Sequence, residues 1–282
     1  MLDIGISTGL FYHRRINFYL PKIKSAGFKA IELWVGASKW GKETHFDYNK
    51  AEEVEEIKRD LRVLSLNVVS LNAPFSELLD ISSMDEMQRS IAVAEIKKTI
   101  SLCEFFNAEY IVIHPSVKTF PLTDIDTVKK KIQAVRKSLN EILENAMLHN
   151  VKVACENPSP HLLGGWAKDL LTLIDRFPKE YLGVCFDVGH ANLIGNPVDF
   201  LKEIADRLFT LHVSDNNSTY SAHLPPGDGN IDWMEFVKAL KEINFKNCFM
   251  LEVLGGARFD DIDEVLKKSY KRADEILKKA DL

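Results

Sequence analysis

The sequence predicts an α/β protein with the (β/α)8 TIM-barrel fold, in which eight parallel strands form a barrel inside a ring of helices. We expect residues 1–282 to form a single domain of this kind. Short apolar runs alternate with segments of helical periodicity along the whole chain. The runs are apolar throughout, as expected of parallel strands that are covered on both faces. The length of 282 residues also suits the roughly 250 residues typical of this barrel.

The apolar runs and the periodic segments give the predicted elements in order. Strands are predicted over residues 2–7, 29–34, 66–71, 110–113, 151–155, 183–186, 208–211 and 247–251. Helices are predicted over residues 16–26, 49–64, 84–106, 125–149, 168–176, 197–206, 233–243 and 260–280. Three helix ends carry suitable residues, since Gly27 can end a helix, Asp124 can cap one and Pro197 can open one.

A doubly wound open sheet is the alternative for a chain that alternates strand and helix. That fold usually carries a glycine-rich phosphate loop after its first strand. Here the first predicted strand is followed by Thr8-Gly9-Leu10-Phe11, which lacks the GxGxxG pattern. The sequence therefore favours the barrel.

Composition limits the partners and the location that we expect. The net charge of −5 provides no general attraction to nucleic acid, and no apolar run approaches the ~18 residues of a membrane span. The first residues enter a strand without the pattern of a signal peptide, and the four cysteines have no CxxC spacing. We expect a cytoplasmic protein with reduced thiols. The sequence does not decide whether the protein forms a homo-oligomer, because helix surfaces and subunit interfaces look alike in sequence.

Five predicted strands end at a residue that can bind a metal or carry a proton. These residues are His114, Glu156, Asp187, His212 and Glu252. The carboxyl ends of barrel strands share one face, so these side chains should meet there, with His190 and His223 close by. Each has a structural explanation when taken alone, such as a hydrogen-bonded histidine or a carboxylate that caps a helix. Together, buried carboxylates require cations, and the set predicts a site for zinc, manganese, cobalt or magnesium.

The motifs around these residues carry a family resemblance. Residues 156–158 (ENP), 187–192 (DVGHAN), 212–216 (HVSDN) and 223–233 (HLPPGDGNIDW) resemble the xylose isomerase-like TIM-barrel superfamily. That superfamily contains sugar isomerases and epimerases as well as endonuclease IV. The likeness extends from Gly5 to Glu252 and supports the same fold.

The resemblance implies roles for individual residues. In epimerase-like members a quartet binds one divalent metal, and the quartet falls on Glu156, Asp187, His212 and Glu252, of which Glu156 and Glu252 are also the acid/base pair. Endonuclease IV-like members hold three zinc ions, and His114, His190 and His223 match the additional ligands. The residues expected to contact substrate are His190, His114, Asn72, Trp34 and His223.

The sequence departs from both family patterns. Asn72 and Ser221 stand where the zinc pattern has a histidine and an aspartate. No arginine follows closely after His212 to hold a sugar hydroxyl, because Ser218 and Thr219 stand there instead. The site residues therefore predict a metal centre more firmly than they predict its substrate.

We expect a divalent-metal-dependent sugar or sugar phosphate isomerase or epimerase. It would move a proton alpha to a carbonyl through a metal-stabilised enediolate. The first alternative is an endonuclease IV-like zinc phosphodiesterase acting at abasic sites, which needs basic loops. Lys39 and Lys42 lie in one loop beside Glu43, whereas residues 216–223 contain no Lys or Arg. A small carbohydrate is thus the favoured partner, nucleic acid is less favoured, and the second alternative is a sugar-binding barrel without catalysis.

Overall fold

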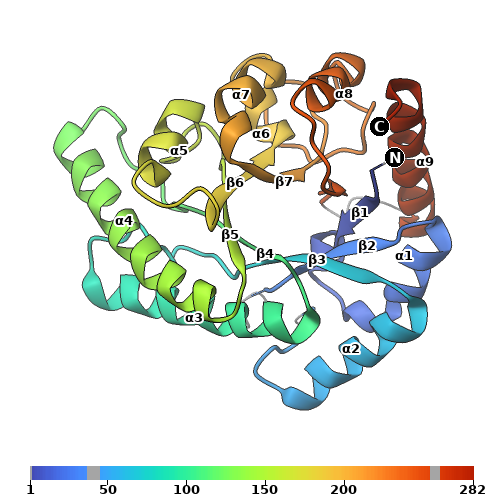
Figure 1. The fold of residues 1–282 in the computed structure, drawn as a ribbon, viewed down its shortest axis with the longest axis horizontal. Coiled ribbons are helices and arrows are strands. Elements are labelled where there is room, and N and C mark those ends of the chain that lie inside the picture. Colours follow the sequence, from blue (N-terminus) through green and yellow to red (C-terminus); the bar gives the residue numbers. More distant parts are fainter. Residues whose placement is uncertain (1, 37–44, 255–260) are drawn as a thin grey trace.

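The computed structural model describes residues 2–36, 45–254 and 261–282, and it has the predicted (β/α)8 barrel architecture (Figure 1). Its eight strands are all parallel and lie in the order β7-β6-β5-β4-β3-β2-β1-β8. The strands are β1 (Ile4–Ser7), β2 (Ala30–Trp34), β3 (Asn67–Asn72), β4 (Tyr110–Ile113), β5 (Lys152–Glu156), β6 (Leu182–Asp187), β7 (Leu208–His212) and β8 (Phe249–Leu251). Each overlaps a predicted strand.

The first and last strands of this order, β7 and β8, close the barrel only briefly. A single parallel bridge pairs Val213 with Leu251. Two backbone hydrogen bonds form it, from the Val213 amide to the Met250 carbonyl at 2.8 Å and from the Glu252 amide to the Val213 carbonyl at 2.9 Å. The barrel is therefore nearly closed, with its shortest ladder beside residues 212 and 252.

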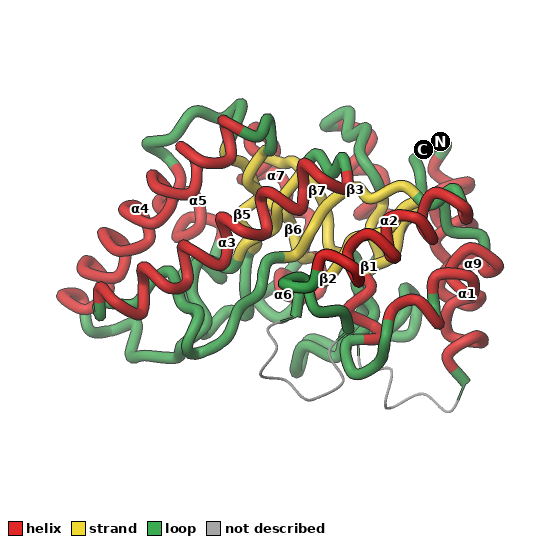
Figure 2. Tube along the Cα trace, turned by 90° about the horizontal axis from the view of Figure 1, so that it is seen from below, coloured by secondary structure: helices red, strands yellow, loops and turns green. Residues whose placement is uncertain are grey.

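Helices cover the outside of the barrel, and in Figure 2 most loops gather at the lower edge, where α6 also lies. The α-helices are α1 (Leu20–Ala26), α2 (Ala51–Leu64), α3 (Glu86–Phe106), α4 (Ile125–Leu148), α5 (Ala167–Ile174), α6 (Val188–Asn192), α7 (Pro197–Ile204), α8 (Trp233–Glu242) and α9 (Ile262–Ala280). Short 3-10 turns are η1 (Thr8–Phe11), η2 (Ile16–Phe18) and η4 (Ala205–Arg207). No helix of the described residues is long and apolar enough to cross a membrane.

Most predicted helix ends are confirmed, and two predictions need correction. Asp124 caps α4 through the Thr127 amide, and Gly27 ends α1 with a φ of 114°. The predicted helix 16–26 is instead two pieces, η2 and α1, because Pro21 in the first turn of α1 has no N–H to continue the preceding turn. Helix α6 was not predicted at all. Residue 260, the predicted start of the last helix, lies outside the described residues.

The interior of the barrel has an apolar floor below the strand ends. One buried cluster joins Ala30, Cys248 and Met250, and another joins Val112, Ala154 and Cys185. Alternate residues of the same strands point outward and pack under the helices. Polar side chains at the carboxyl ends of the strands therefore lie above an apolar layer.

Two one-residue register shifts set which side chains face one another near this end. Between β2 and β3, Ile31 pairs with Val68, but the next pair is Glu32 with Ser70. Between β6 and β7, Val184 pairs with Leu208, but the next pair is Cys185 with Thr210. An extra residue in one strand, here Val69 and Phe209, changes the face to which all later side chains point. After these bulges Glu32 lies opposite Ser70, and Asp187 lies opposite His212.

Candidate metal centre

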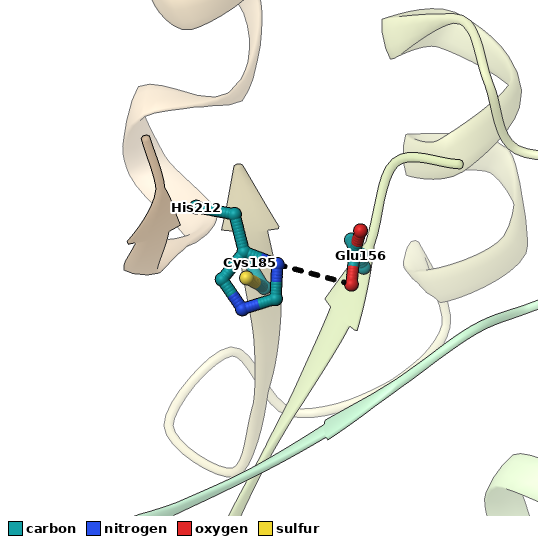
Figure 3. A group of neighbouring side chains, drawn as sticks. All are labelled: Glu156, Cys185 and His212. Atoms are coloured by element: carbon teal, nitrogen blue, oxygen red, sulfur yellow. Dashed lines mark ion pairs between the residues drawn. The ribbon is translucent and has the colours of Figure 1, made fainter. Parts of the chain in front are cut away.

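Four predicted ligands meet at the carboxyl ends of the last four strands. Glu156, Asp187 and His212 are the final residues of β5, β6 and β7, and Glu252 directly follows β8. All four are buried, and each offers an atom within 4.8 Å of the others. We call these four residues the quartet. Figure 3 shows two of its members, Glu156 and His212, with the Cys185 sulfur beside the imidazole.

Each member of the quartet has one buried atom without a hydrogen-bond partner. These atoms are Glu156 Oε2, Asp187 Oδ2, His212 Nδ1 and Glu252 Oε2. His212 Nδ1 lies 3.2 Å from Glu156 Oε2 and 3.4 Å from Glu252 Oε2. Unpaired carboxylate oxygens crowded together in a buried place are costly without a compensating cation. One imidazole nitrogen and three carboxylate oxygens are a donor set that suits a divalent cation.

The other atoms of Asp187 are fixed by its neighbours. Its Oδ1 accepts a 2.6 Å hydrogen bond from the His190 amide and thereby caps α6. The Asn157 side chain holds the Asp187 backbone on both sides, because its Oδ1 accepts from the amide at 2.7 Å and its Nδ2 donates to the carbonyl at 2.9 Å. The sequence allowed a purely structural role for Asp187 as a helix cap, and the structure shows this cap on Oδ1 together with an unpartnered Oδ2.

The two glutamates of the quartet differ in protonation. Burial raises the pKa of Glu252, and the carboxylates of Glu156 and Asp187 add to this against the opposing effect of His212, so that the pKa lies well above its usual range. Burial also acts to raise the pKa of Glu156, but His114 and His212 outweigh it and hold the pKa below its usual range. In this site burial and the nearby carboxylates thus favour the protonated form of Glu252, whereas the nearby histidines favour the ionised form of Glu156.

His212 responds to the same surroundings in the opposite sense. Burial alone would lower its pKa, but the acidic groups around the ring, Cys185, Glu252, Glu32 and Glu156, raise the pKa well above 6.5. Burial raises the pKa of the Cys185 thiol well above its usual range. Carboxylates therefore lie close to both nitrogens of the His212 ring.

A second group, the trio, contains Asp187, His190 and His223, which also offer atoms within 4.8 Å of one another. The Nδ1 atoms of both histidines lie near backbone oxygens, at 2.9 Å from the Asn157 carbonyl for His190 and 3.1 Å from the Glu252 carbonyl for His223. The two rings stand perpendicular with centroids 5.6 Å apart. Their Nε2 atoms are therefore the ones available to a ligand.

The loop that carries His223 is held by a buried carboxylate. Asp215 accepts hydrogen bonds from the Gly227 amide at 2.7 Å and from the Trp233 indole N–H at 2.8 Å. Its own backbone pairs with Leu224 in both directions, at 2.8 and 2.9 Å. The motif HLPPGDGNIDW is thus closed into a rigid loop by Asp215, which keeps His223 over the site.

A cavity of about 350 Å³ opens beside both groups, and this volume lies at the lower end of those that hold small molecules. Its described lining residues are Phe75, Ser76, Glu77, His114, Ser116, Val117, Glu156, Pro158, Ser159, Leu162, His190, His223, Glu252 and Leu254. His114 lies with its Nε2 3.4 Å from Glu156 Oε2, and the Phe75 ring packs on its imidazole with centroids 3.9 Å apart. Burial lowers the pKa of His114 below its usual value, and the carboxylate of Glu156 opposes this effect.

The two remaining residues expected to contact substrate, Asn72 and Trp34, lie outside the described lining of the cavity. Asn72 is buried at the end of β3, and neither atom of its amide has a hydrogen-bond partner. Trp34 packs edge-on against Phe75 with ring centroids 6.5 Å apart. Lys39, Lys42 and Glu43 lie outside the described residues.

Two polar residues beside the quartet were not assigned a role from the sequence. Asn157 belongs to the ENP motif, but its contacts with Asp187 have no signature in spacing. Glu32 lies 3.1 Å from His212 Nε2 and is fully buried. The available signal was an acid inside the apolar run KAIELW, at a position where a strand covered on both faces rarely carries a charge.

Relatives of this chain carry several names. An uncharacterized protein of Methanocaldococcus jannaschii is 28% identical, over 89% of this chain and 83% of its own length. An inosose isomerase of Bacillus velezensis is 23% identical over 73% of this chain and 74% of its own. A probable endonuclease 4 of Natranaerobius thermophilus is 24% identical over 93% of this chain and 99% of its own.

Solved structures and family profiles agree with the barrel seen here. A crystal structure of a D-tagatose 3-epimerase-like protein superposes with a TM-score of 0.85 at 25% identity, covering 99% of this chain and 98% of the other. The sequence profile of the family described as "Xylose isomerase-like TIM barrel" matches residues 20–276. The chain therefore belongs to the xylose isomerase-like TIM barrel family.

Proposed function

We propose that this protein is a divalent-metal-dependent isomerase or epimerase of a small sugar or sugar phosphate. The observation that carries the proposal is the convergence of four unpartnered ligand atoms beside a cavity that two glutamates also line. Glu156 ends β5 and Glu252 follows β8, and each has an oxygen within 3.4 Å of His212 Nδ1. The names of the inosose isomerase and the D-tagatose 3-epimerase-like protein support the same class of reaction.

The chemistry needs a proton to leave a carbon atom and a proton to return. A divalent cation such as Mn, Zn, Co or Mg, held by the quartet, would polarise a substrate carbonyl and make the neighbouring C–H acidic. Glu156, whose pKa is lowered, is ionised and takes the proton from that carbon. Glu252, whose pKa is raised, gives its own proton to the other face of the carbon or to the adjacent oxygen. Before the next turnover in the same direction, Glu156 loses its proton to solvent and Glu252 regains one from solvent.

The histidines of the cavity wall have a supporting role in this proposal. His190 and His223 each hold Nδ1 against a backbone carbonyl, so that Nε2 can bond a substrate hydroxyl. His114 is stacked on Phe75 in the cavity wall, where its ring could contact a substrate hydroxyl. These side chains would orient the sugar rather than change its bonds.

Proton exchange with solvent tests the proposal without knowledge of the exact sugar. The protein is stripped with a chelator, reloaded with one metal at a time and incubated in D₂O with ketopentoses, ketohexoses, inososes and their phosphates. Deuterium at the carbon alpha to the carbonyl, detected by NMR, is the expected result. Glu156→Gln and Glu252→Gln should each lose at least 10²-fold of this exchange. Undiminished exchange in either variant would contradict the acid/base assignment.

An endonuclease IV-like phosphodiesterase is the second candidate, and the trio is the observation that favours it. Asp187, His190 and His223 could hold a further cation. The probable endonuclease 4 of Natranaerobius thermophilus is similar over nearly the whole chain. Ser221 and Asn72 still replace two residues of the three-zinc pattern. Incision of a duplex with one abasic site, measured across zinc concentrations, would favour this candidate, and a protein with neither metal nor activity would be the sugar-binding barrel.

A further inference from the structure

We propose that Glu32 is a positioning residue that fixes the imidazole of His212, so that Nδ1 presents its lone pair to the quartet. This role rests on the proposed function only in that the quartet must hold a cation, whatever the sugar. Glu32 lies on β2 and His212 on β7, and 180 residues separate them in the sequence. Their side chains are both fully buried and meet in the interior of the barrel.

The two nitrogens of His212 have different surroundings. Nε2 lies 3.1 Å from Glu32 Oε2, while Nδ1 faces the unpartnered oxygens of Glu156 and Glu252. A carboxylate only accepts hydrogen bonds, so the Nε2 position must carry the hydrogen. A cation that displaces the hydrogen on Nδ1 then meets the lone pair of Nδ1, the atom on the side of the quartet, while Nε2 keeps its own hydrogen. Metal-binding histidines generally have their other nitrogen held in this way.

Glu32 is held in turn by Ser70, whose hydroxyl donates to Glu32 Oε2 at 2.8 Å. Both side chains are fully buried. Ser70 lies opposite Glu32 only because of the register shift at Val69. In an unbroken ladder Glu32 would pair with Val69, which offers no donor. The bulge in β3 therefore gives the carboxylate a fixed hydrogen bond and a fixed orientation.

A purely structural role is the competing explanation for this buried acid. Stability alone accounts poorly for it, because removing a carboxylate from water is costly and Glu32 Oε1 has no partner among the described residues. The bulge at Phe209 acts on the other side of the pair, since it places His212 opposite Asp187. One irregularity thus places Ser70 opposite Glu32, and the other places His212 opposite Asp187. Bulges of this kind are frequent next to functional sites.

The test compares Glu32→Gln with a matched control, Thr210→Val. Thr210 is also buried and lies two residues before His212, but its hydroxyl has no partner. Zinc and manganese affinities of the stripped proteins are measured by calorimetry or chelator competition. We expect Glu32→Gln to weaken binding by about 10- to 100-fold, and Thr210→Val to stay within about threefold of wild type. Ser70→Ala, which removes only the support of Glu32, should fall between them.

A spectroscopic measurement keeps the test independent of folding and of turnover. The ¹⁵N resonances of the ring nitrogens report which nitrogen of His212 carries hydrogen. At a pH high enough to leave His212 neutral, we expect hydrogen on Nε2 in wild type, and in Glu32→Gln a mixture or the opposite tautomer. Unchanged tautomer and affinity in a folded Glu32→Gln protein would overturn the proposal. Wild-type protein that binds metal but exchanges no sugar proton would instead overturn the proposed function and leave the role of Glu32 intact.

Discussion

The quartet and the trio share Asp187 but differ in how their atoms are used. In the quartet each member has one buried ligand atom that lacks a hydrogen-bond partner. In the trio both histidines line the cavity and have Nδ1 near a backbone carbonyl, which leaves Nε2 available to a ligand. The first arrangement suits a resident cation, and the second suits contact with a ligand that comes and goes. Nearness of metal-binding side chains alone would not separate these two cases.

The largest effect is expected from Asp187→Asn, because Asp187 belongs to both groups. The amide oxygen can still cap α6 through the His190 amide, whereas the unpartnered oxygen becomes a donor. We expect bound metal to fall from about one ion per chain to nearly none, and proton exchange to fall by about 10³-fold, since a Lewis acid contributes several kcal/mol. Elemental analysis and NMR measure both, and a melting curve of the stripped protein controls for folding. Full metal content in the variant would show that Asp187 is not a ligand.

A smaller effect concerns acid stability, where the histidines outside the quartet differ from His212. Burial lowers the pKa of His45 to about 4, although the Phe11 and Arg14 carbonyls near its Nδ1 oppose this. An unfolded chain protonates this ring near pH 6.5, so between pH 6.5 and 4 the unfolded state binds more protons. Stability then falls as the pH falls, by about 3 kcal/mol across this window.

The variant His45→Gln should lack this contribution to the dependence of unfolding free energy on pH. Urea unfolding of the stripped protein at several pH values measures it, with His161→Gln, which removes an exposed imidazole, as the control. Burial also lowers the pKa of His223, so His223→Gln should flatten the profile in the same direction. His212→Gln should have the opposite effect on the profile. The raised pKa of His212 stabilises the fold below pH 6.5, and this stabilisation is lost as the pH rises above the raised pKa. Parallel profiles for all four proteins would contradict these assignments.

Substitutions of the two histidines of the trio should have a smaller effect than the changes above. His190→Gln and His223→Gln should each lower kcat/KM by about tenfold, the value of one hydrogen bond of about 1.4 kcal/mol. Metal content should stay at about one ion per chain in both variants. Loss of the ion in either would instead make the trio part of the metal centre and would favour the zinc phosphodiesterase.

The smallest effect is expected from Ser221→Asp, which supplies the acid that the three-zinc pattern has at this position. We expect it to let the trio bind an additional zinc ion, while sugar proton exchange changes by less than about threefold. Zinc titration by calorimetry counts the sites, with Ser218→Asp in the same loop as the control. An unchanged count would mean that the trio cannot hold a metal even when its missing ligand is present.

Much of this arrangement could be predicted from the sequence, and the reason lies in the parallel barrel. The carboxyl ends of all strands share one face, so reading the residue after each apolar run was enough to bring Glu156, Asp187, His212 and Glu252 together. The same reasoning predicted His114, His190 and His223 nearby. The order of the strands and the face of the site both follow from the alternation of strand and helix.

The contacts that orient these side chains could not be predicted in that way. Glu32 and His212 come from strands far apart in the sequence, and no spacing rule connects them. The bulges at Val69 and Phe209 look like ordinary strand residues, because the irregularity belongs to the pairing and not to one strand. Asn157 holds Asp187 through its side chain and again leaves no periodic signal. Local pattern therefore predicts which residues meet, and only the paired structure gives their orientation.

The short ladder between β7 and β8 has a mechanical consequence. It is the junction of the barrel with the fewest backbone bonds among the described strands, and the quartet straddles it, with His212 on one side and Glu252 on the other. An ion that binds both residues would link β7 to β8, so that metal binding would stabilise the closed barrel. Amide exchange at Val213 and Glu252 should then slow down when metal is added, and the stripped barrel should begin to open there.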